Sequence, residues 1–266
     1  MDFERRVRTV SYRTLKFASA AFNFAGEQFL PRERVWMEYA GYDLLVDPRD
    51  HIGTQLYISG EYEPEIGAIL AERTPTNGIA VEIGAHLGHH SLQMRQKTGS
   101  EGTIYAVEPH PINADIIRQT ISQNGFENVH CKEAAVGGEE GQIGLIEHKT
   151  QNSGASTISD VEGDTTYTVD VTTLPLLYDT CGLDHADTIK IDVEGAEYDI
   201  LSGIDNLSDY TDFAVIELHG KDHLTDAEMD ELRTSLKNWG SNLSLQPSEP
   251  AASIDNQSNV TAIWES

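Results

Sequence analysis

Basic residues, and lysine in particular, are scarce in this sequence. It holds 18 lysines and arginines against 44 aspartates and glutamates, which gives a formal net charge of −26, and only seven of the basic residues are lysines. Such a surface suits molar salt, where the Debye length falls to ~3 Å and repulsion between carboxylates is screened. We therefore expect a halophilic cytoplasmic protein. The alternative is an ordinary acidic protein that has a basic partner.

Cysteines and long apolar runs are also scarce. Cys131 and Cys181 are the two cysteines, and neither belongs to a Cys-x-x-Cys pair. A zinc ribbon and a disulfide framework are therefore unsupported. No apolar run approaches the length of a transmembrane helix.

The first residues of the chain differ in charge from the rest. Five basic residues lie between Arg5 and Lys16, in a stretch that suits an amphipathic helix. We expect residues 1–34 to form an extension that packs on its own domain or on a partner subunit of a homo-oligomer. The alternative is that residues 1–25 lie on the anionic inner face of a membrane.

Strand and helix patterns alternate through most of the chain, which predicts one α/β domain over residues 35–266 with a doubly wound, Rossmann-like sheet. A hairpin and an irregular segment are expected first, over 35–58, and then a helix over 61–73. Residues 138–187 interrupt the alternation with two extra strands around a polar loop. The strands that we expect in the main sheet cover 78–86, 102–110, 129–137, 188–193, 212–220 and a closing pair at 242–247 and 260–265.

A glycine turn and an acidic residue indicate the kind of cofactor. Gly84 and Gly88 follow a strand and open a helix, and their spacing is not the Gly-x-Gly-x-x-Gly of dinucleotide sites. Glu108 ends the next strand, where a carboxylate can accept hydrogen bonds from both ribose hydroxyls, and Pro109 follows it. These features favour an adenosine cofactor without a pyrophosphate, namely S-adenosylmethionine.

Charged residues at two strand ends indicate an active site. Asp192 and Glu194 follow one strand and Glu217 and His219 end the next, at the edge where open parallel sheets bind ligands. We expect Lys190 to pair with one of these carboxylates. We expect Asp192 to orient the cofactor or the acceptor and His219 to act as base, with Glu217 as the other candidate. A divalent cation held by Asp192 and Glu217 and an ion-paired strand end that only holds loops are the alternatives.

Six motifs carry a resemblance to a known family: GEYEPE, VEIGAHLGHHSL, YAVEPHP, NSGASTI, IKIDVEGAEYDILSGI and VIELH, in this order over residues 55–220. With them the chain resembles the FkbM family of S-adenosylmethionine-dependent methyltransferases. The resemblance implies a seven-stranded sheet that is mostly parallel with an antiparallel last strand. It also implies O-methylation of a sugar, a polyketide or a related hydroxyl.

The resemblance also implies site residues. The cofactor contacts it implies are Glu82, Gly84, Ala85 and Gly88 at the methionine end, Glu108 at the ribose and Glu133 near the adenine. We also expect His86, Pro109 and Asp192 to contact the cofactor. The acceptor contacts we expect are Tyr62, Glu63, Asn152, Ser153 and Glu194.

The chain departs from the family at three histidines. The family often has Asn-x-Gly-Tyr-Tyr where this chain has His86-Leu87-Gly88-His89-His90. Three histidines this close can bind zinc. However, His89 and His90 are neighbours on a predicted helix and point about 100° apart, so we expect these two to have packing roles instead.

The sequence thus predicts O-methylation of a carbohydrate, such as a cell-surface glycan. An N- or O-methyltransferase of a small metabolite and an inactive scaffold that binds S-adenosylmethionine are the alternatives. A nucleic-acid substrate is not favoured, because Asp-Val-Glu-Gly stands where amino methyltransferases of bases have an Asn/Asp-Pro-Pro-Tyr/Phe element, and because no basic groove is evident beyond the N-terminus.

Overall fold

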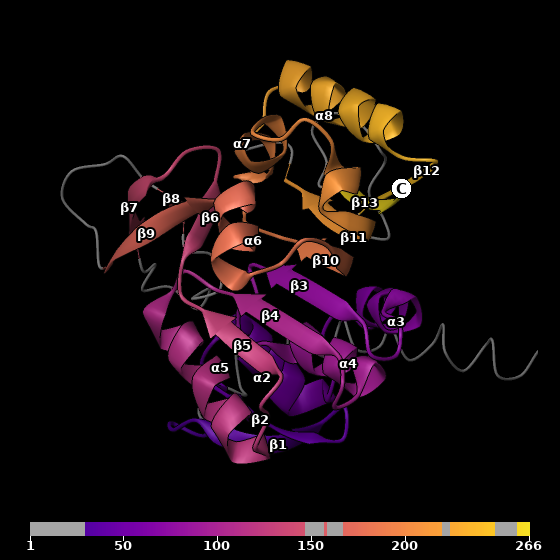
Figure 1. Ribbon diagram of the computed structural model, residues 1–266. Helices are drawn as coiled ribbons and strands as arrows, with labels where there is room; N and C mark the ends of the chain where they lie inside the picture. The colour runs from indigo at the N-terminus through magenta and orange to yellow at the C-terminus, as the bar shows by residue number, and fades with distance from the viewer. Residues whose placement is uncertain (1–29, 147–156, 159–166, 220–223, 248–259) are drawn as a thin grey trace, which may run out of the picture.

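A computed structural model describes residues 30–146, 157–158, 167–219, 224–247 and 260–266. Its centre is a seven-stranded twisted sheet in the order β12-β13-β11-β10-β3-β4-β5 (Figure 1). The strands of this sheet are β3 (Ile79–Ile83), β4 (Thr103–Val107), β5 (Val129–Lys132), β10 (Ala186–Ile191), β11 (Thr211–Leu218), β12 (Asn242–Pro247) and β13 (Val260–Glu265).

Strand directions confirm the predicted fold class. β3 pairs in parallel with β4 and β10, and the parallel pairing continues to β5 on one side and to β11 on the other. The last strand, β13, lies antiparallel between β11 and β12. The sheet is therefore mostly parallel with an antiparallel last strand, and the carboxyl ends of the five strands that pair in parallel, β11, β10, β3, β4 and β5, share one edge.

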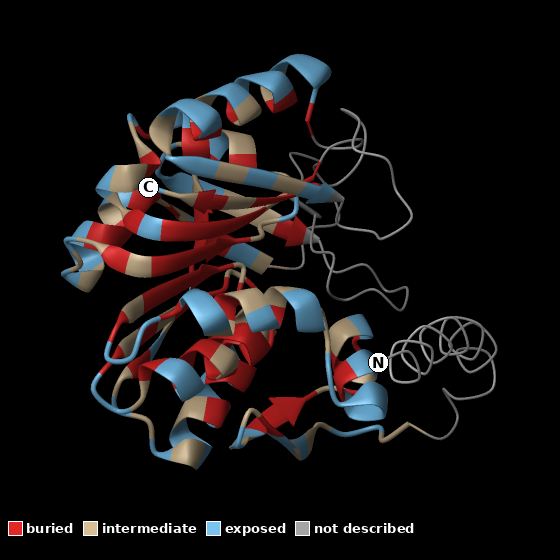
Figure 2. Cartoon of the chain, turned by 90° about the vertical axis from the view of Figure 1, so that its right-hand side faces the viewer, coloured by how far each residue is buried: buried red, intermediate tan, exposed pale blue. Residues whose placement is uncertain are grey.

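Helices cover both faces of the sheet, because alternate residues of each buried strand point to opposite sides. On β3, Ala80 packs in the cluster formed with α3 (Pro64–Arg73) and α4 (His89–Thr98). Val81 points to the other face and packs in the cluster with α6, α7 and α8. In Figure 2 the inner strands of the sheet are mostly buried and the covering helices alternate between buried and exposed residues, whereas the edge strand β12 alternates between exposed and partly buried residues. The remaining helices are α5 (Pro111–Asn124), α6 (Leu174–Cys181), α7 (Glu197–Ser202), α8 (Asp226–Trp239) and the short 3-10 helix η1 (Leu207–Asp209).

A second, smaller sheet in the order β6-β9-β7-β8 lies beside the edge of the main sheet where its parallel strands have their carboxyl ends. It consists of β6 (Ala135–Gly137), β7 (Gly141–Ile146), β8 (Thr157–Ile158) and β9 (Tyr167–Thr173). The expectation of a single strand over 129–137 is therefore wrong, since that stretch breaks at residues 133–134 and its second half pairs with β9. The two extra strands predicted between residues 138 and 187 are confirmed as β7 and β9.

The segment after the N-terminal hairpin was also expected to be irregular, and this is wrong. The hairpin of β1 (Val35–Tyr39) and β2 (Tyr42–Val46) is followed by a helix, α2 (His51–Ser59). The Asp50 side chain caps its first turn by accepting a hydrogen bond from Gly53 N–H.

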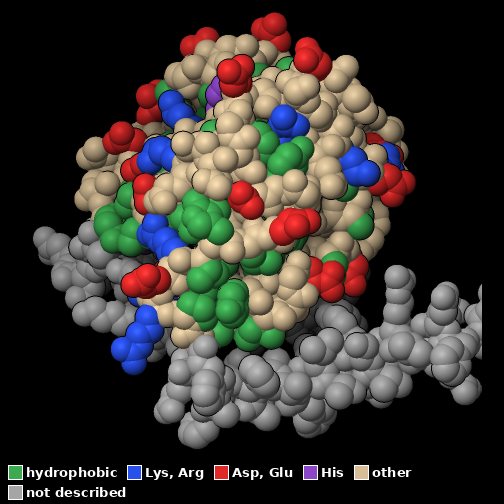
Figure 3. Space-filling view, turned by 90° about the horizontal axis from the view of Figure 1, so that it is seen from below, with side chains coloured by type: hydrophobic (Ala, Val, Ile, Leu, Met, Phe, Trp, Pro, Cys, Tyr) green, Lys and Arg blue, Asp and Glu red, His purple; other side chains and the backbone are tan. Residues whose placement is uncertain are grey.

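Part of the N-terminal prediction falls on residues 1–29, which lie outside the described residues, so both the extension and its membrane alternative stay predictions. The hairpin that follows packs on α5, where Asn124 bonds the backbone of Asp43 in both directions. Trp36, Tyr57 and Ile58 are exposed large apolar side chains of β1 and α2. Seen from below, hydrophobic side chains gather next to lysine and arginine side chains (Figure 3). No described helix has the length and apolarity needed to cross a membrane.

Candidate active site

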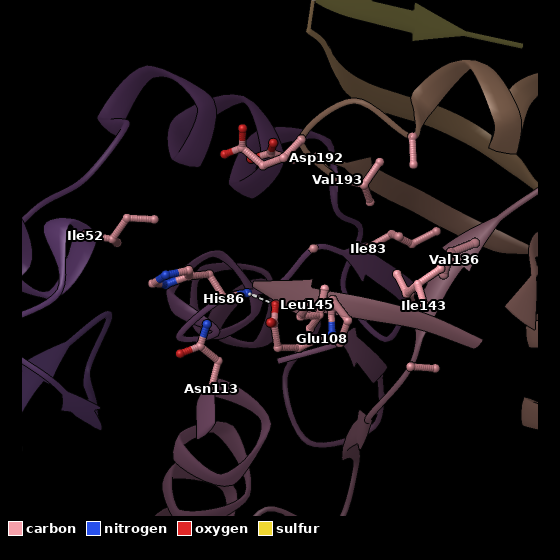
Figure 4. A pocket seen from close by; sticks show the side chains of 16 residues that line it. Ile52, Ile83, His86, Glu108, Asn113, Val136, Ile143, Leu145, Asp192 and Val193 are labelled. Carbon is pink, nitrogen blue, oxygen red and sulfur yellow. Dashed lines mark hydrogen bonds between the residues drawn. The ribbon is translucent and has the colours of Figure 1, made fainter. Parts of the chain in front are cut away.

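A cavity opens at the carboxyl ends of β3, β4 and β10 (Figure 4). Six of the residues that line it were expected in the site from the sequence: Gly84, His86, Glu108, Pro109, Asp192 and Glu194. The other lining residues were not foreseen. Ile52 comes from α2 and Asn113 from α5, while Ile143 and Leu145 of β7 form an apolar wall. Only the tertiary fold brings these elements to one cavity.

Gly84 is required where it stands. Its φ of +84° is in the left-handed region, and a Cβ on it would lie 1.7 Å from the carbonyl oxygen of Asp192. Asp192 N–H in turn donates to the carbonyl of Ile83. The turn after β3 therefore presses its backbone against the end of β10, which only glycine allows.

Glu108 follows β4, is buried, lines the cavity and binds two backbone N–H groups there. Its two carboxylate oxygens accept hydrogen bonds from His86 N–H and His110 N–H, each at 2.8 Å. Burial raises the pKa of Glu108, and the charge of His86 opposes this rise. Each carboxylate oxygen can accept more than one hydrogen bond, so ribose hydroxyls could still bind to it.

Four residues expected to contact the cofactor do not line the cavity: Glu82, Ala85, Gly88 and Glu133. Glu82 is fully buried beside Ser91, whose hydroxyl donates to its carboxylate. Glu133 forms an ion pair with Arg118 at 2.7 Å. Their expected cofactor contacts stay predictions. Asn152 and Ser153, expected to contact the acceptor, lie outside the described residues.

Carboxylates from three separate elements meet beside the cavity. Glu63 precedes α3, Asp192 follows β10 and Glu217 lies on β11, and one oxygen of each lies within 4.8 Å of the others. The Lys190 ammonium donates to Asp192 at 2.8 Å, which confirms the pairing expected from the sequence. Burial alone would raise the pKa of Asp192, but Lys190 and His219 hold it below its ordinary value.

The pKa of Glu217 is shifted in the opposite direction to that of Asp192. The backbone of Glu217 belongs to the ladder with β13, whereas its carboxylate forms no hydrogen bond or ion pair with another described residue. Burial raises its pKa to about 7, helped by the charges of Asp192 and Glu63. A carboxylate with such a pKa exchanges a proton near neutrality, as a general base does.

His219 is held by acids on both sides of its ring. Its Nδ1 lies 2.8 Å from Glu197 Oε1, and its Nε2 lies 3.5 Å from Glu194 and 3.8 Å from Asp192. Burial alone would lower its pKa, but the hydrogen bond to the buried Glu197 and the surrounding carboxylates raise it to about 10. The imidazole is therefore protonated at neutral pH and donates hydrogen bonds there.

The remaining expected residues surround this cluster. Tyr62 packs edge-on against His89 with ring centroids 5.4 Å apart, and its phenol has a raised pKa because it is largely buried. His90 lies 3.2 Å from Glu63 and His86 lies 3.6 Å from Asp50. The three neighbouring histidines thus have different partners. The described residues offer two groups with the spacing of metal ligands, Glu63-Asp192-Glu217 and Asp192-Glu194-His219.

Comparison with known proteins agrees with this architecture. The sequence model of the methyltransferase FkbM domain matches residues 82–243, and the chain belongs to this family. The hexuronic acid methyltransferase AglP of Haloferax volcanii is 22% identical over 165 residues, which are 59% of this chain and 62% of that protein. A protein-L-isoaspartate O-methyltransferase of Methanocella arvoryzae is 33% identical over 102 residues, 38% of this chain and 53% of the relative. The matches thus span only about half to two thirds of these relatives.

Solved structures of methyltransferases are also similar. An FkbM methyltransferase from Methylobacillus flagellatus has a TM-score of 0.46 at 15% identity, over 70% of this chain and 43% of that one. TYW2 of M. jannaschii, in complex with AdoMet, has a TM-score of 0.45 at 13% identity, over 87% and 85% of the two chains.

Proposed function

We propose that this protein is an S-adenosylmethionine-dependent O-methyltransferase whose acceptor is a hydroxyl of a carbohydrate or a related molecule. The observation that carries the proposal is one cavity that joins Glu108, at the end of β4, to the carboxylates at the end of β10. Membership of the FkbM family supports methyl transfer. The carbohydrate is supported by the similarity to a hexuronic acid methyltransferase.

The residues present fit the cofactor. Glu108 offers a buried carboxylate for ribose hydroxyls, and Gly84 keeps the turn after β3 free of a side chain. The apolar wall of Ile143 and Leu145 suits an adenine ring. When bound, S-adenosylmethionine supplies a methyl group that its sulfonium activates.

The chain's own contribution is to position the acceptor and to remove its proton. We assign the base role to Glu217, because its pKa of about 7 lets it accept the hydroxyl proton near neutral pH. Asp192, kept ionised by Lys190 and His219, accepts a hydrogen bond that orients the acceptor. The base role predicted for His219 is less favoured, because a protonated imidazole cannot accept a proton until it has lost one of its own.

A divalent cation is the alternative activator of the hydroxyl. The oxygens of Glu63, Asp192 and Glu217 are the hard ligands that Mg²⁺ or Ca²⁺ prefers. Dialysis against EDTA separates the two versions. A metal requirement predicts loss of activity and its restoration by added Mg²⁺ or Mn²⁺, whereas full activity in EDTA supports Glu217 acting alone.

Calorimetry with S-adenosylmethionine and S-adenosylhomocysteine tests the cofactor first. Incubation with labelled S-adenosylmethionine and a panel of neutral sugars, hexuronic acids and small hydroxylated or amino metabolites then tests the acceptor, with mass spectrometry of the product. A methyl ether of a sugar supports the proposal. An N-methyl product would support the metabolite alternative, and cofactor binding without transfer to any acceptor would support the inactive scaffold. Absence of cofactor binding by the folded protein would refute the proposal.

A further inference from the structure

We propose that His86, held by Asp50, is the cation that receives the carboxylate of the cofactor's methionyl group. The inference rests on the proposed cofactor and deepens it. It assigns a partner to one end of the ligand and makes cofactor binding depend on pH.

The first observation is the position of the ring. His86 lines the cavity with Ile52 and Asn113, on the side of Glu108 away from the apolar wall (Figure 4). Its backbone N–H bonds Glu108, so the ribose acceptor and the imidazole are held in one rigid turn. If the ribose binds Glu108 and the adenine lies on Ile143 and Leu145, the methionyl group extends toward His86.

The second observation is the charge of the lining. Among the described residues that line the cavity, His86 is the one side chain able to carry a positive charge, whereas Glu108, Asp192 and Glu194 are acids. The methionyl end of S-adenosylmethionine carries one carboxylate beside an ammonium and a sulfonium. The acids suit the two cations, and the carboxylate is left with His86 as its partner.

The third observation is an unused donor. The side chain of His86 is only 12% exposed, its Nε2 faces Asp50 Oδ1 at 3.6 Å, and its Nδ1 has no hydrogen-bond partner among the described residues. A buried ring nitrogen without a partner is costly unless a ligand satisfies it. A carboxylate oxygen is the complementary acceptor.

The surroundings favour the charged form of His86. The groups that face it are Asp50 before α2, Glu108 after β4, Asp192 after β10 and, with the opposite effect, His89 on α4. Burial alone would lower the pKa of His86, but Asp50 and the other two carboxylates raise it above its ordinary value. The imidazole therefore keeps its positive charge to a higher pH than an ordinary histidine does, and loses it as the pH rises through this raised pKa.

The test compares two ligands that share the adenosine moiety. S-Adenosylhomocysteine has the amino-acid end, and 5′-methylthioadenosine lacks it. Calorimetry at a fixed KCl concentration should show that His86→Asn weakens binding of S-adenosylhomocysteine by about ten- to a hundredfold and leaves 5′-methylthioadenosine within about twofold. His130→Asn, at an exposed histidine of β5, is the matched control and should change neither affinity.

The pH dependence gives a second readout. For the wild type, the affinity for S-adenosylhomocysteine divided by the affinity for 5′-methylthioadenosine should fall as the pH rises from 6 to 9.5. In His86→Asn the fall of this ratio should be much smaller. Asp50→Asn retains a good helix cap but removes the charge that holds the imidazolium, so the fall should move to lower pH. Equal loss of both ligands in folded His86→Asn, or no loss of either, would overturn the inference while the proposed cofactor stands. If wild-type protein binds neither ligand, the proposed function fails and this inference fails with it.

Discussion

Replacing Glu108 with alanine tests both the cofactor site and the turn that builds it. The carboxylate accepts two backbone hydrogen bonds of 2.8 Å from His86 and His110. A hydrogen bond to a charged group contributes roughly 1.5 to 3 kcal/mol. Water entering the open cavity can replace part of this, so we expect the free energy of unfolding to fall by about 2 to 4 kcal/mol.

Cofactor affinity should fall as well, because two ribose hydroxyls lose their acceptor. The cost is about 2 to 3 kcal/mol if both bonds are charge-assisted, which corresponds to a thirty- to hundredfold rise in Kd, roughly. Urea unfolding and calorimetry in the same buffer separate the two effects. Glu101→Ala, which removes an exposed carboxylate that precedes β4 and does not line the cavity, is the control. A folded Glu108→Ala protein that binds S-adenosylhomocysteine as tightly as the wild type would refute the assignment.

Four further predictions concern the base, the glycine turn, the surface charge and the N-terminus. Glu217→Gln should lower turnover by about 10² to 10⁴ and remove the rise of wild-type activity with pH through about 7; near-normal turnover would leave alignment or a metal as the source of rate. Gly84→Ala forces a Cβ into the Asp192 carbonyl, so cofactor binding should be lost and the melting temperature lowered, and a variant with wild-type affinity would contradict the geometry. The melting temperature of the wild type should rise between 0.1 and ~2 M KCl, whereas a flat curve would remove the halophilic interpretation. Deletion of residues 1–25 should leave cofactor affinity unchanged and should abolish sedimentation with anionic liposomes if the membrane alternative holds, whereas a deleted protein that fails to fold would show that the segment belongs to the core or to a subunit interface.

The sheet was predictable because its signals are local. Alternating apolar residues, the glycine turn at Gly84 and the proline that opens α5 are each read within a few residues of sequence. α2 was missed because its apolar pattern is short, although Asp50 as N-cap and Gly60 after its last residue are the usual signals of a helix. Residues 133–134 gave no such signal of a break, and only pairing with β9 separates β6 from β5.

By itself, the sequence determined the order of the strands along the chain, the acidic composition, the family and the charged residues at the ends of β10 and β11. Only the tertiary structure decided which of those charges act together. Glu63 comes from more than a hundred residues earlier and meets Asp192 and Glu217 within 4.8 Å. Protonation was decided there too, because a pKa depends on burial and on neighbours in space. The tertiary structure therefore keeps His219 protonated at neutral pH and raises the pKa of Glu217 to about 7, although both residue types can serve as bases.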